Sequence, residues 1–387
     1  QPECAARLRS LLGPAGILRA SPYVHRLQWR GAPSAQLSDL LRVHEYEYLR
    51  KIEATCDALK RAEAADPLTT KTDMLDSDTI VTAHSYAAAL RGAGAAIEAV
   101  RSLCAEPREA RNAFCAIRPP GHHAGPRGAV GGQSAGFCLL SSAAIAAAYA
   151  MHVHREKVKK VAIVDFDIHH GNGTEACVRN LIPSEWREAF QTAAGTLTMA
   201  GVACKPWLGA DDASNVFFSS IHGFGADAPP PGPDADDDDE SPVGLFYPGS
   251  GGPATSSEAP RICNLPVALR TPSGRWRRVM LEKMLLPLAA FAPDLVVICA
   301  GFDAHAHDPL EAGGLHEVDY EWMTQELVGI AETHCEGRVV SVLEGGYRVT
   351  GGALSSLARA AGAHVGALMD TSLAGVKWRA DAATQRL

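Results

Sequence analysis

Long hydrophobic runs, paired cysteines and an excess of basic residues are all missing from this chain of 387 residues. Because no apolar run reaches the roughly eighteen residues typical of a transmembrane helix, we expect no membrane-spanning segment. A formal net charge of -8 argues against a nucleic-acid-binding surface. The ten cysteines occur singly, without a C-x-x-C pair, so we expect reduced thiols in a reducing compartment, the cytoplasm or the nucleus. Since the chain begins at Gln1 rather than at a methionine, an organelle is retained as an alternative location.

Apolar runs of strand length alternate with helix-like stretches along most of the chain. The five expected strands are 113–117, 161–164, 216–221, 295–300 and 338–343. The expected helices are 85–103, 139–153, 276–291, 317–334 and 353–368. Continuous apolar strands that alternate with amphipathic helices predict an α/β fold with a mostly parallel sheet covered on both faces. We expect one domain over residues 1–387, with a C-terminal tail from about residue 372.

Two segments depart from this alternation and are expected to be insertions. Residues 176–215 are long for a single connection, and within them "PSEWREAF" predicts a short helix capped by Ser184. Residues 225–244, "GADAPPPGPDADDDDESPVG", are of low complexity and rich in proline and aspartate. That composition is typical of an exposed, mobile loop.

Four of the expected strands end in unusual clusters of polar residues. The clusters read "RPPGHHAG", "DFDIHHGNG", "GFDAHAHDP" and "EGGY". In open α/β sheets, ligands bind outside the carboxyl ends of the strands. We therefore expect the functional site where these four clusters meet.

The second cluster places ionisable side chains at every other position. Asp165, Asp167 and His169 would point to the same face of an extended chain. Two carboxylates that converge there would repel each other unless a positive charge lay among them. With Asp303 from the third cluster, Asp167 and His169 form a plausible three-ligand set, which is the number that catalytic zinc uses. Taken alone, Asp167 would more often be a helix cap and His169 a satisfied polar residue, but the cluster at Asp303 favours the metal.

A pair of histidines, His122 and His123, follows "RPPG" in a turn that its prolines and glycine hold in place. Beside a metal-bound water, one of them has the right intrinsic pKa to act as a general base and then as a general acid. Asp165 is available to raise the basicity of one histidine, and Asn172 to hydrogen-bond the other without adding charge. On their own, paired histidines in a loop would more often be surface residues.

Tyr347 follows two glycines, whose lack of side chains lets the loop approach a ligand closely. A tyrosine hydroxyl aimed at a carbonyl oxygen would stabilise a developing oxyanion. The alternative is an ordinary interfacial tyrosine. Gly136, Phe137 and Tyr247 would either wall a narrow apolar slot or belong to the core.

Together and in this order, the four motifs resemble those of the histone deacetylase family of zinc amidohydrolases, in particular class II and its bacterial relatives. The resemblance extends from "PECAARL" near the start of the chain to the helix beyond "EGGY". It implies an arginase-like α/β domain with a central, mostly parallel sheet of about eight strands. It also implies one zinc ion per chain and the removal of acetyl or acyl groups from lysine side chains of histones or other proteins.

The resemblance assigns roles to the residues that match the motifs. The implied zinc ligands are Asp167, His169 and Asp303, and the implied catalytic residues are His122, His123, Tyr347, Asp165 and Asn172, with His123 as general base and acid. The acyl-lysine channel would be lined by Gly136, Phe137 and Tyr247. A structural potassium ion would involve Asp165, Asp167, His169, Ser220 and Ile221. Asp76, or the nearby Asp78, falls where some relatives hold the substrate backbone.

Two positions indicate class and substrate. Asn172 stands where class I members of the family have aspartate, which is consistent with class II. Relatives that prefer polyamines carry an acidic residue after the "DP" pair, whereas this chain has Leu310. We therefore expect an acetylated peptide or protein as the substrate and partner, with an acetylpolyamine or another small amide as the alternative.

Two other functions compete with deacetylation. An arginase-like ureohydrolase would need further carboxylates to bridge two manganese ions, but His305 stands where the second aspartate of that motif would be. A non-catalytic scaffold that binds acetyl-lysine around a structural zinc would favour a shell rich in cysteine, and the expected shell has none. The motifs make no prediction about the oligomeric state.

Overall fold

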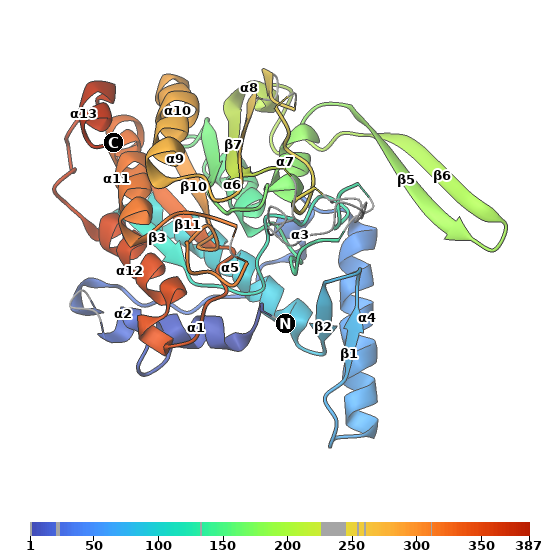
Figure 1. Ribbon diagram of the computed structural model, residues 1–387. Coiled ribbons are helices and arrows are strands. Elements are labelled where there is room, and N and C mark those ends of the chain that lie inside the picture. The colour runs from blue at the N-terminus through green and yellow to red at the C-terminus, as the bar shows by residue number, and fades with distance from the viewer. Residues whose placement is uncertain are drawn as a thin grey trace, which may run out of the picture.

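A central sheet of seven strands runs through the part of the chain that the computed structural model describes, namely residues 2–20, 24–131, 134–225, 245–253, 255–258, 261–310 and 312–387. Its strand order is β3-β11-β10-β4-β7-β9-β8, and all neighbours are parallel except β8 and β9 (Figure 1). The strands are β3 (Asn112–Cys115), β4 (Val161–Asp165), β7 (Val216–Gly223), β8 (Ser257–Glu258), β9 (Arg261–Val267), β10 (Leu295–Ala300) and β11 (Val339–Leu343). This sheet confirms the expected α/β class and the five predicted strands.

The middle strands are buried along their whole length. Every residue of β4, β10 and β11 is buried, which is why these segments are continuous apolar runs rather than alternating ones. Their ends are nearly level, because Cys299 lies opposite Asp165 and Ala300 lies opposite Leu343. The residues that follow the three strands therefore meet at one edge of the sheet.

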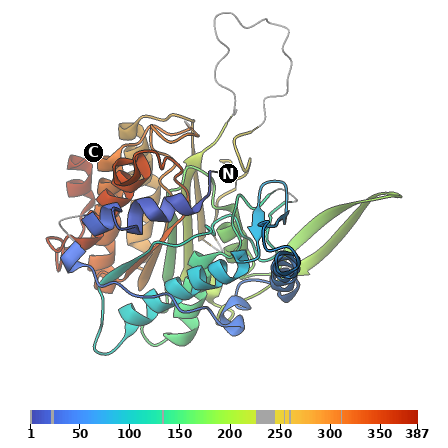
Figure 2. The ribbon, with the colours of Figure 1, turned by 90° about the horizontal axis from the view of Figure 1, so that it is seen from below.

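Helices cover both faces of the sheet, and each face has its own hydrophobic core (Figure 2). Alternate residues of β4 belong to opposite cores, Val161 and Ile163 to one and Ala162 and Val164 to the other. One core includes α5 (Ser85–Cys104) and α6 (Ser142–Val153). The other includes α9 (Ser273–Met280), the π-helical turn η2 (Leu281–Leu285), α10 (Leu286–Phe291), α11 (Glu317–Cys335) and α12 (Ser356–Met369). The five predicted helices are all present near their expected bounds.

The remaining elements are short or lie at the periphery. They are α1 (Ala5–Leu12), α2 (Ile17–Ala20), η1 (Val24–Arg26), α3 (Leu37–Leu40), α4 (Tyr46–Ala65), β1 (Thr72–Met74), β2 (Ile80–Thr82), α7 (Asn172–Arg179), α8 (Asp212–Asn215), η3 (Gly352–Leu354) and α13 (Ala380–Gln385). Just after α13, Arg386 pairs with Glu326 of α11, so the end of the chain contacts the helical layer. Among the described residues, no helix is long and apolar enough to cross a membrane.

The insertion at 176–215 contains a β-hairpin, so the helix predicted in "PSEWREAF", with Ser184 as its cap, is wrong. Strand β5 (Ser184–Thr192) pairs antiparallel with β6 (Gly195–Ala203), and the hairpin extends away from the sheet (Figure 1). In β6, Leu197 and Met199 alternate with threonines, and this period of two suits a strand. In β5, Trp186 and Phe190 are four positions apart, a spacing that a helix also allows, and pairing with β6 places Phe190 opposite Leu197. Gly195, at a φ of +121°, closes the turn. Residues 226–244, which make up almost all of the other predicted insertion, lie outside the described residues.

One buried histidine joins α12 to α11 and β11. The His364 ring is bridged by the hydroxyls of Thr324 and Ser341, at 2.6 and 2.8 Å. Because the Thr324 hydroxyl donates to the Tyr320 carbonyl, the imidazole donates to Thr324 and accepts from Ser341, which is the neutral form. Burial lowers the pKa of His364 to about 3.

We expect His364 to make the free energy of unfolding decrease as the pH falls. The unfolded chain takes up a proton on this residue near pH 6.5, whereas the folded chain takes it up only near pH 3. The stabilisation is therefore complete above pH 6.5 and is lost below it at about 1.4 kcal/mol per pH unit. Urea denaturation between about pH 6.5 and pH 4 should show a shallower dependence for His364→Gln, while the exposed His84→Gln should follow the wild type. Equal slopes for His364→Gln and the wild type would contradict this expectation.

Candidate active site

The polar residues at the strand ends lie together at one edge of the sheet. Asp165 is the last residue of β4, Asp167 and His169 follow it, and Asp303 follows β10. The three aspartates are fully buried and His169 is nearly so. They meet because parallel neighbours in register end at the same level, with Asp165 opposite Cys299. The structure therefore brings together the residues that the sequence predicts as a metal site.

Two carboxylates surround one imidazole at the centre of this group. The Nδ1 atom of His169 lies 3.1 Å from Asp167 Oδ1 and 3.1 Å from Asp303 Oδ2. Backbone amides orient the carboxylates, since Gly345 donates to Asp167 at 2.8 Å and Ile168 donates to Asp303 at 3.1 Å. A Cβ atom on Gly345 would lie only 2.1 Å from Asp303 Oδ2. Position 345 must therefore be glycine for the carboxylate to sit where it does.

The chemistry of these donors fits a metal ion. One potential ligand atom each from Asp167, His169 and Asp303 lies within 4.8 Å of the others. Although Asp303 Oδ2 is buried, it makes no hydrogen bond of good geometry within the described residues, as suits an oxygen that faces a cation. Burial opposes a charged His169, yet Asp167 and Asp303 raise the pKa of its imidazole to about 10. The group thus attracts positive charge, and two carboxylate oxygens with one imidazole nitrogen are ligands that zinc accepts.

His122 and His123 lie beside this group and have different partners. The Nδ1 atom of His122 is 3.0 Å from Asp165 Oδ2, and the Nδ1 atom of His123 is 2.8 Å from Asn172 Oδ1. The centroids of the two imidazole rings are 3.9 Å apart. Because an amide oxygen only accepts hydrogen bonds, His123 carries its proton on Nδ1 and leaves the lone pair of Nε2 free.

The two histidines also differ in charge. Burial disfavours the charged form of His122, but Asp167 and Asp165 outweigh this effect and raise its pKa to about 10. Burial, together with the neighbouring His122 and His169, lowers the pKa of His123 well below its usual value. Opposite shifts in adjacent groups are typical of acid–base sites. His123 is the neutral member of the pair and is able to accept a proton.

Tyr347 is fixed both through its backbone and through its ring. Its N–H group donates to Asp308 at 2.7 Å, and the Arg7 guanidinium lies 5.0 Å from the ring centroid. Phe137 meets the ring edge-on. Burial raises the pKa of the Tyr347 hydroxyl well above its usual value, so the hydroxyl keeps its proton and acts as a hydrogen-bond donor.

The structure brings Gly136 and Tyr247 beside His123, with Phe137 next along the chain. The Tyr247 ring lies 5.0 Å from that of His123, and its hydroxyl donates to the Ser134 carbonyl at 2.8 Å. Gly136 has a φ of +49°, and a Cβ atom there would lie 2.5 Å from the His123 ring. A side chain at position 136 would therefore displace the histidine.

The two aspartates predicted to contact the substrate at the rim accept hydrogen bonds from other residues of the protein. Asp76 accepts hydrogen bonds from the Thr79 and Ala135 amides at 2.9 and 3.0 Å, and Asp78 accepts one from the Ser134 hydroxyl at 2.5 Å. Both aspartates thus anchor the segment that leads into Gly136. Leu310 is 40% exposed, and Glu311 lies outside the described residues.

Ser220 and Ile221, which the resemblance assigns to a potassium site, lie on β7 and are fully buried. Ser220 lies opposite Asp165 in the parallel register, and its hydroxyl is 3.0 Å from His222 Nδ1. The two residues are therefore next to the β4 end that carries the other predicted potassium ligands.

Three residues at the site were not assigned by sequence reasoning. Glu344 accepts hydrogen bonds from the Gly121 and His122 amides. Arg7 donates to the Glu344 and Gly346 carbonyls, and Asp308 accepts from the Tyr347 amide. The positions of Glu344 in "EGGY" and of Asp308 in "HDP" were available as signals. Arg7 lies in "PECAARL", where the resemblance begins, but nothing near it in the sequence indicated that it contacts the site.

A second histidine cluster lies near the site but does not suit a metal ion. His305, His316 and Glu317 have potential ligand atoms within 4.8 Å of one another. The backbone N–H group of His307 donates to His305 Nδ1 at 3.0 Å, so in the neutral ring the proton is on Nε2. That nitrogen faces Glu317 at 3.4 Å. Nε2 makes no hydrogen bond of good geometry within the described residues, and with its proton there the neutral His305 ring has no free lone pair for a metal ion.

The comparison with known protein families decides which enzymes this site belongs with. Residues 1–368 match the model of the histone deacetylase domain. The chain belongs to the histone deacetylase family. The family is zinc-dependent in general, and membership makes the chain a hydrolase that acts on amides. It favours deacetylase chemistry over the arginase-like and scaffold alternatives.

Relatives in this family come from bacteria, archaea and eukaryotes. The histone deacetylase-like amidohydrolase of Pseudomonas aeruginosa is 33% identical over 350 residues, covering 89% of this chain and 71% of that protein. A probable deacetylase of Archaeoglobus fulgidus is 30% identical over 320 residues, covering 82% and 68%. Type-2 histone deacetylase 2 of Dictyostelium discoideum is 30% identical over 360 residues, which cover 87% of this chain but only 18% of that protein. The crystal structure of the HDA15 HD domain matches with a TM-score of 0.69 and 27% identity, over 97% of this chain and 87% of that one.

Proposed function

We propose that this member of the family is a zinc-dependent deacylase that removes acetyl groups from lysine side chains of peptides or proteins. The observation that carries the proposal is the neutral His123, which keeps the lone pair of Nε2 free and whose ring centroid lies 5.9 Å from that of His169, a candidate metal ligand. A base with its lone pair free, beside a site for a Lewis acid, is the combination that amide hydrolysis by water requires. Several relatives carry deacetylase or amidohydrolase in their names, which supports this reaction class.

Each side chain has a distinct role in the proposed reaction. Zinc, when bound by Asp167, His169 and Asp303, supplies the Lewis acidity that activates water and the amide carbonyl. His123 Nε2 takes a proton from the attacking water and returns it to the departing lysine amine. The Tyr347 hydroxyl donates a hydrogen bond to the oxyanion that forms on the carbonyl oxygen.

The surrounding residues support those roles. Charged His122, held by Asp165, stabilises negative charge as it develops, while Asn172 keeps the His123 proton on Nδ1. Phe137 and Tyr247 wall the channel for the aliphatic part of the lysine side chain. We further propose that a structural potassium ion binds near Asp165, Ser220 and Ile221, and the pairing of β4 with β7, which sets Asp165 opposite Ser220, supports this proposal.

Loss of one ligand should remove the metal. Asp303→Ala leaves Asp167 and His169 without a third protein ligand, so we expect loss of zinc and of deacetylase activity. Elemental analysis of purified protein should show one zinc per chain in the wild type and little in the variant. Asp57→Ala, at an exposed position on α4, should keep its zinc. Full zinc retention by Asp303→Ala, or two equivalents of manganese in the wild type, would refute the assignment.

Removing the Tyr347 hydroxyl should impair catalysis without loss of metal. We expect Tyr347→Phe to lower kcat on an acetyl-lysine peptide by about 100- to 1,000-fold, because one oxyanion donor is lost. Zinc content should match the wild type, and Tyr46→Phe, a change at an exposed position, should leave kcat unchanged. His123→Ala should be at least as damaging, since proton transfer to the leaving amine is lost with it. Near-normal turnover by Tyr347→Phe would show that this hydroxyl is not the donor.

Substrate class should depend on the charge at position 310. Leu310 offers no carboxylate to the distal ammonium group of a polyamine, so we expect kcat/KM to be higher for an acetyl-lysine peptide than for N-acetylputrescine or acetylspermidine. Leu310→Glu should shift the ratio toward the polyamines, and Leu310→Gln, similar in size but neutral, should not. A wild-type preference for acetylpolyamines would instead assign specificity to other residues of the rim.

A further inference from the structure

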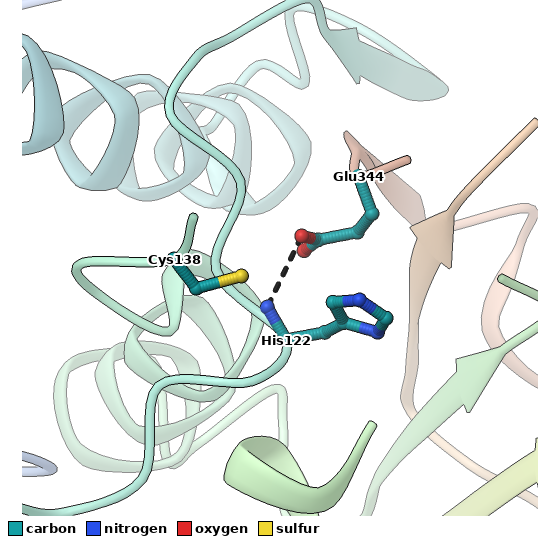
Figure 3. Close-up of side chains that lie close together, drawn as sticks. All are labelled: His122, Cys138 and Glu344. Atoms are coloured by element: carbon teal, nitrogen blue, oxygen red, sulfur yellow. Dashed lines mark hydrogen bonds between the residues drawn. The ribbon is translucent and has the colours of Figure 1, made fainter. Parts of the chain in front are cut away.

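A buried carboxylate connects the end of β11 to the loop that carries the histidine pair. Glu344 is fully buried, and its Oε2 atom accepts hydrogen bonds from the Gly121 amide at 2.6 Å and the His122 amide at 3.1 Å. Figure 3 shows the carboxylate facing the backbone nitrogen of His122, with the Cys138 thiol close by. The side chain of the residue that follows β11 thus accepts hydrogen bonds from the backbone of a loop far away in sequence.

The close group of His122, Cys138 and Glu344 does not suit a second metal ion, although its potential ligand atoms lie within 4.8 Å of one another. Asp165 and Asp167 keep His122 in its charged form, in which both ring nitrogens carry protons and neither has a lone pair for a metal ion. Of the two Glu344 oxygens, Oε2 already accepts two amides. Burial raises the pKa of the Cys138 thiol well above its usual value, so the thiol keeps its proton, whereas metals bind the thiolate. The group must therefore serve another purpose.

Burying Glu344 lowers the stability of the fold, so stability alone does not explain its presence. Its Oε1 atom is buried and has no hydrogen-bond partner within the described residues. Burial raises the pKa of its carboxyl group to about 7, the direction expected for an acid that is incompletely compensated. A buried polar group that costs stability is sometimes retained because it specifies one geometry.

The same residue lies between the two parts of the site that must be aligned. The Glu344 carbonyl oxygen accepts a hydrogen bond from Arg7, and the next amide, that of Gly345, donates to Asp167. Tyr347 is three residues further along the chain. The backbone at Glu344 is thus tied to a candidate metal ligand, while its side chain holds the histidine loop.

We propose that Glu344 is a positioning residue, which fixes the histidine loop relative to the β11 end through the Gly121 and His122 amides. The consequence passes along the backbone to His123, whose Nε2 must be placed correctly for proton transfer. The inference rests on the proposed deacylase function for its kinetic readout. The amides themselves provide a second readout that does not depend on activity.

The test compares two replacements of Glu344 of similar volume. Glu344→Gln keeps a carbonyl oxygen that accepts both amides, and we expect its kcat on an acetyl-lysine peptide to stay within about threefold of the wild type. Glu344→Met removes the acceptor, and we expect kcat to fall by about 10- to 100-fold with KM and zinc content unchanged, as for a base displaced by a fraction of an ångström. Equal losses in both variants would assign the effect to the charge and overturn the proposal. Unchanged kcat in Glu344→Met would overturn it as well.

A matched control separates positioning from general destabilisation. Val342→Ala, two residues earlier on β11, shortens a fully buried side chain and should lower the melting temperature while leaving kcat unchanged. A similar loss of kcat in Val342→Ala would attribute the effect of Glu344→Met to stability alone.

Hydrogen–deuterium exchange tests the contact directly, even if the deacylase function proves wrong. The Gly121 and His122 amides should exchange at least about tenfold faster in Glu344→Met than in Glu344→Gln, because only the glutamine retains an acceptor. An inactive wild type would refute the proposed function but not this result. Equal protection of the two amides in both variants would overturn the positioning role whatever the activity.

Discussion

The mutual repulsion of three buried carboxylates dominates the structure at the ends of β4 and β10. Asp165, Asp167 and Asp303 are withdrawn from water, which costs several kcal/mol per charge unless each finds compensation. The protein supplies backbone amides, two imidazoles and glycines that leave space for the carboxylate oxygens. The negative charge that these groups leave uncompensated attracts a cation. The family to which the chain belongs is in general zinc-dependent.

The same negative charge explains why two adjacent histidines differ. His122 contacts Asp165 and becomes charged, and its charge then disfavours protonation of His123. An asparagine rather than an acid behind His123 preserves the difference, because Asn172 orients the ring without drawing a proton onto it. A neutral base beside a charged neighbour thus follows from where the aspartates lie. The positioning contact through Glu344 belongs to this arrangement, because a base is effective only at the correct distance.

Local sequence patterns predicted the strands, the clusters at their ends and the residues that meet there. These features depend on burial and on side-chain alternation, which are visible within a few residues of Asp165 or Asp303. The β5–β6 hairpin was missed because its strands are solvent-exposed and form no part of the core, so the expected helix at Ser184 was wrong. The contacts of Glu344 and Arg7 were missed for a different reason. Each joins backbone atoms more than 200 positions away, 223 for the Glu344–Gly121 bond and 339 for the Arg7–Gly346 bond, and no local pattern encodes such a pair.

The candidate metal ligands come from segments that lie far apart in the sequence, so the free metal concentration affects the stability of the folded state. The hydrogen bond between Gly345 and Asp167 spans 178 positions, so the candidate ligands form a set only after β4, β10 and β11 have assembled. A cation that binds this set and not the unfolded chain stabilises the native state by mass action, by about 2.7 kcal/mol when its free concentration is 100 times its dissociation constant. Metal scarcity would then lower the amount of folded enzyme as well as its turnover, and a proteolytic nick between β4 and β10 would weaken metal binding without altering any ligand.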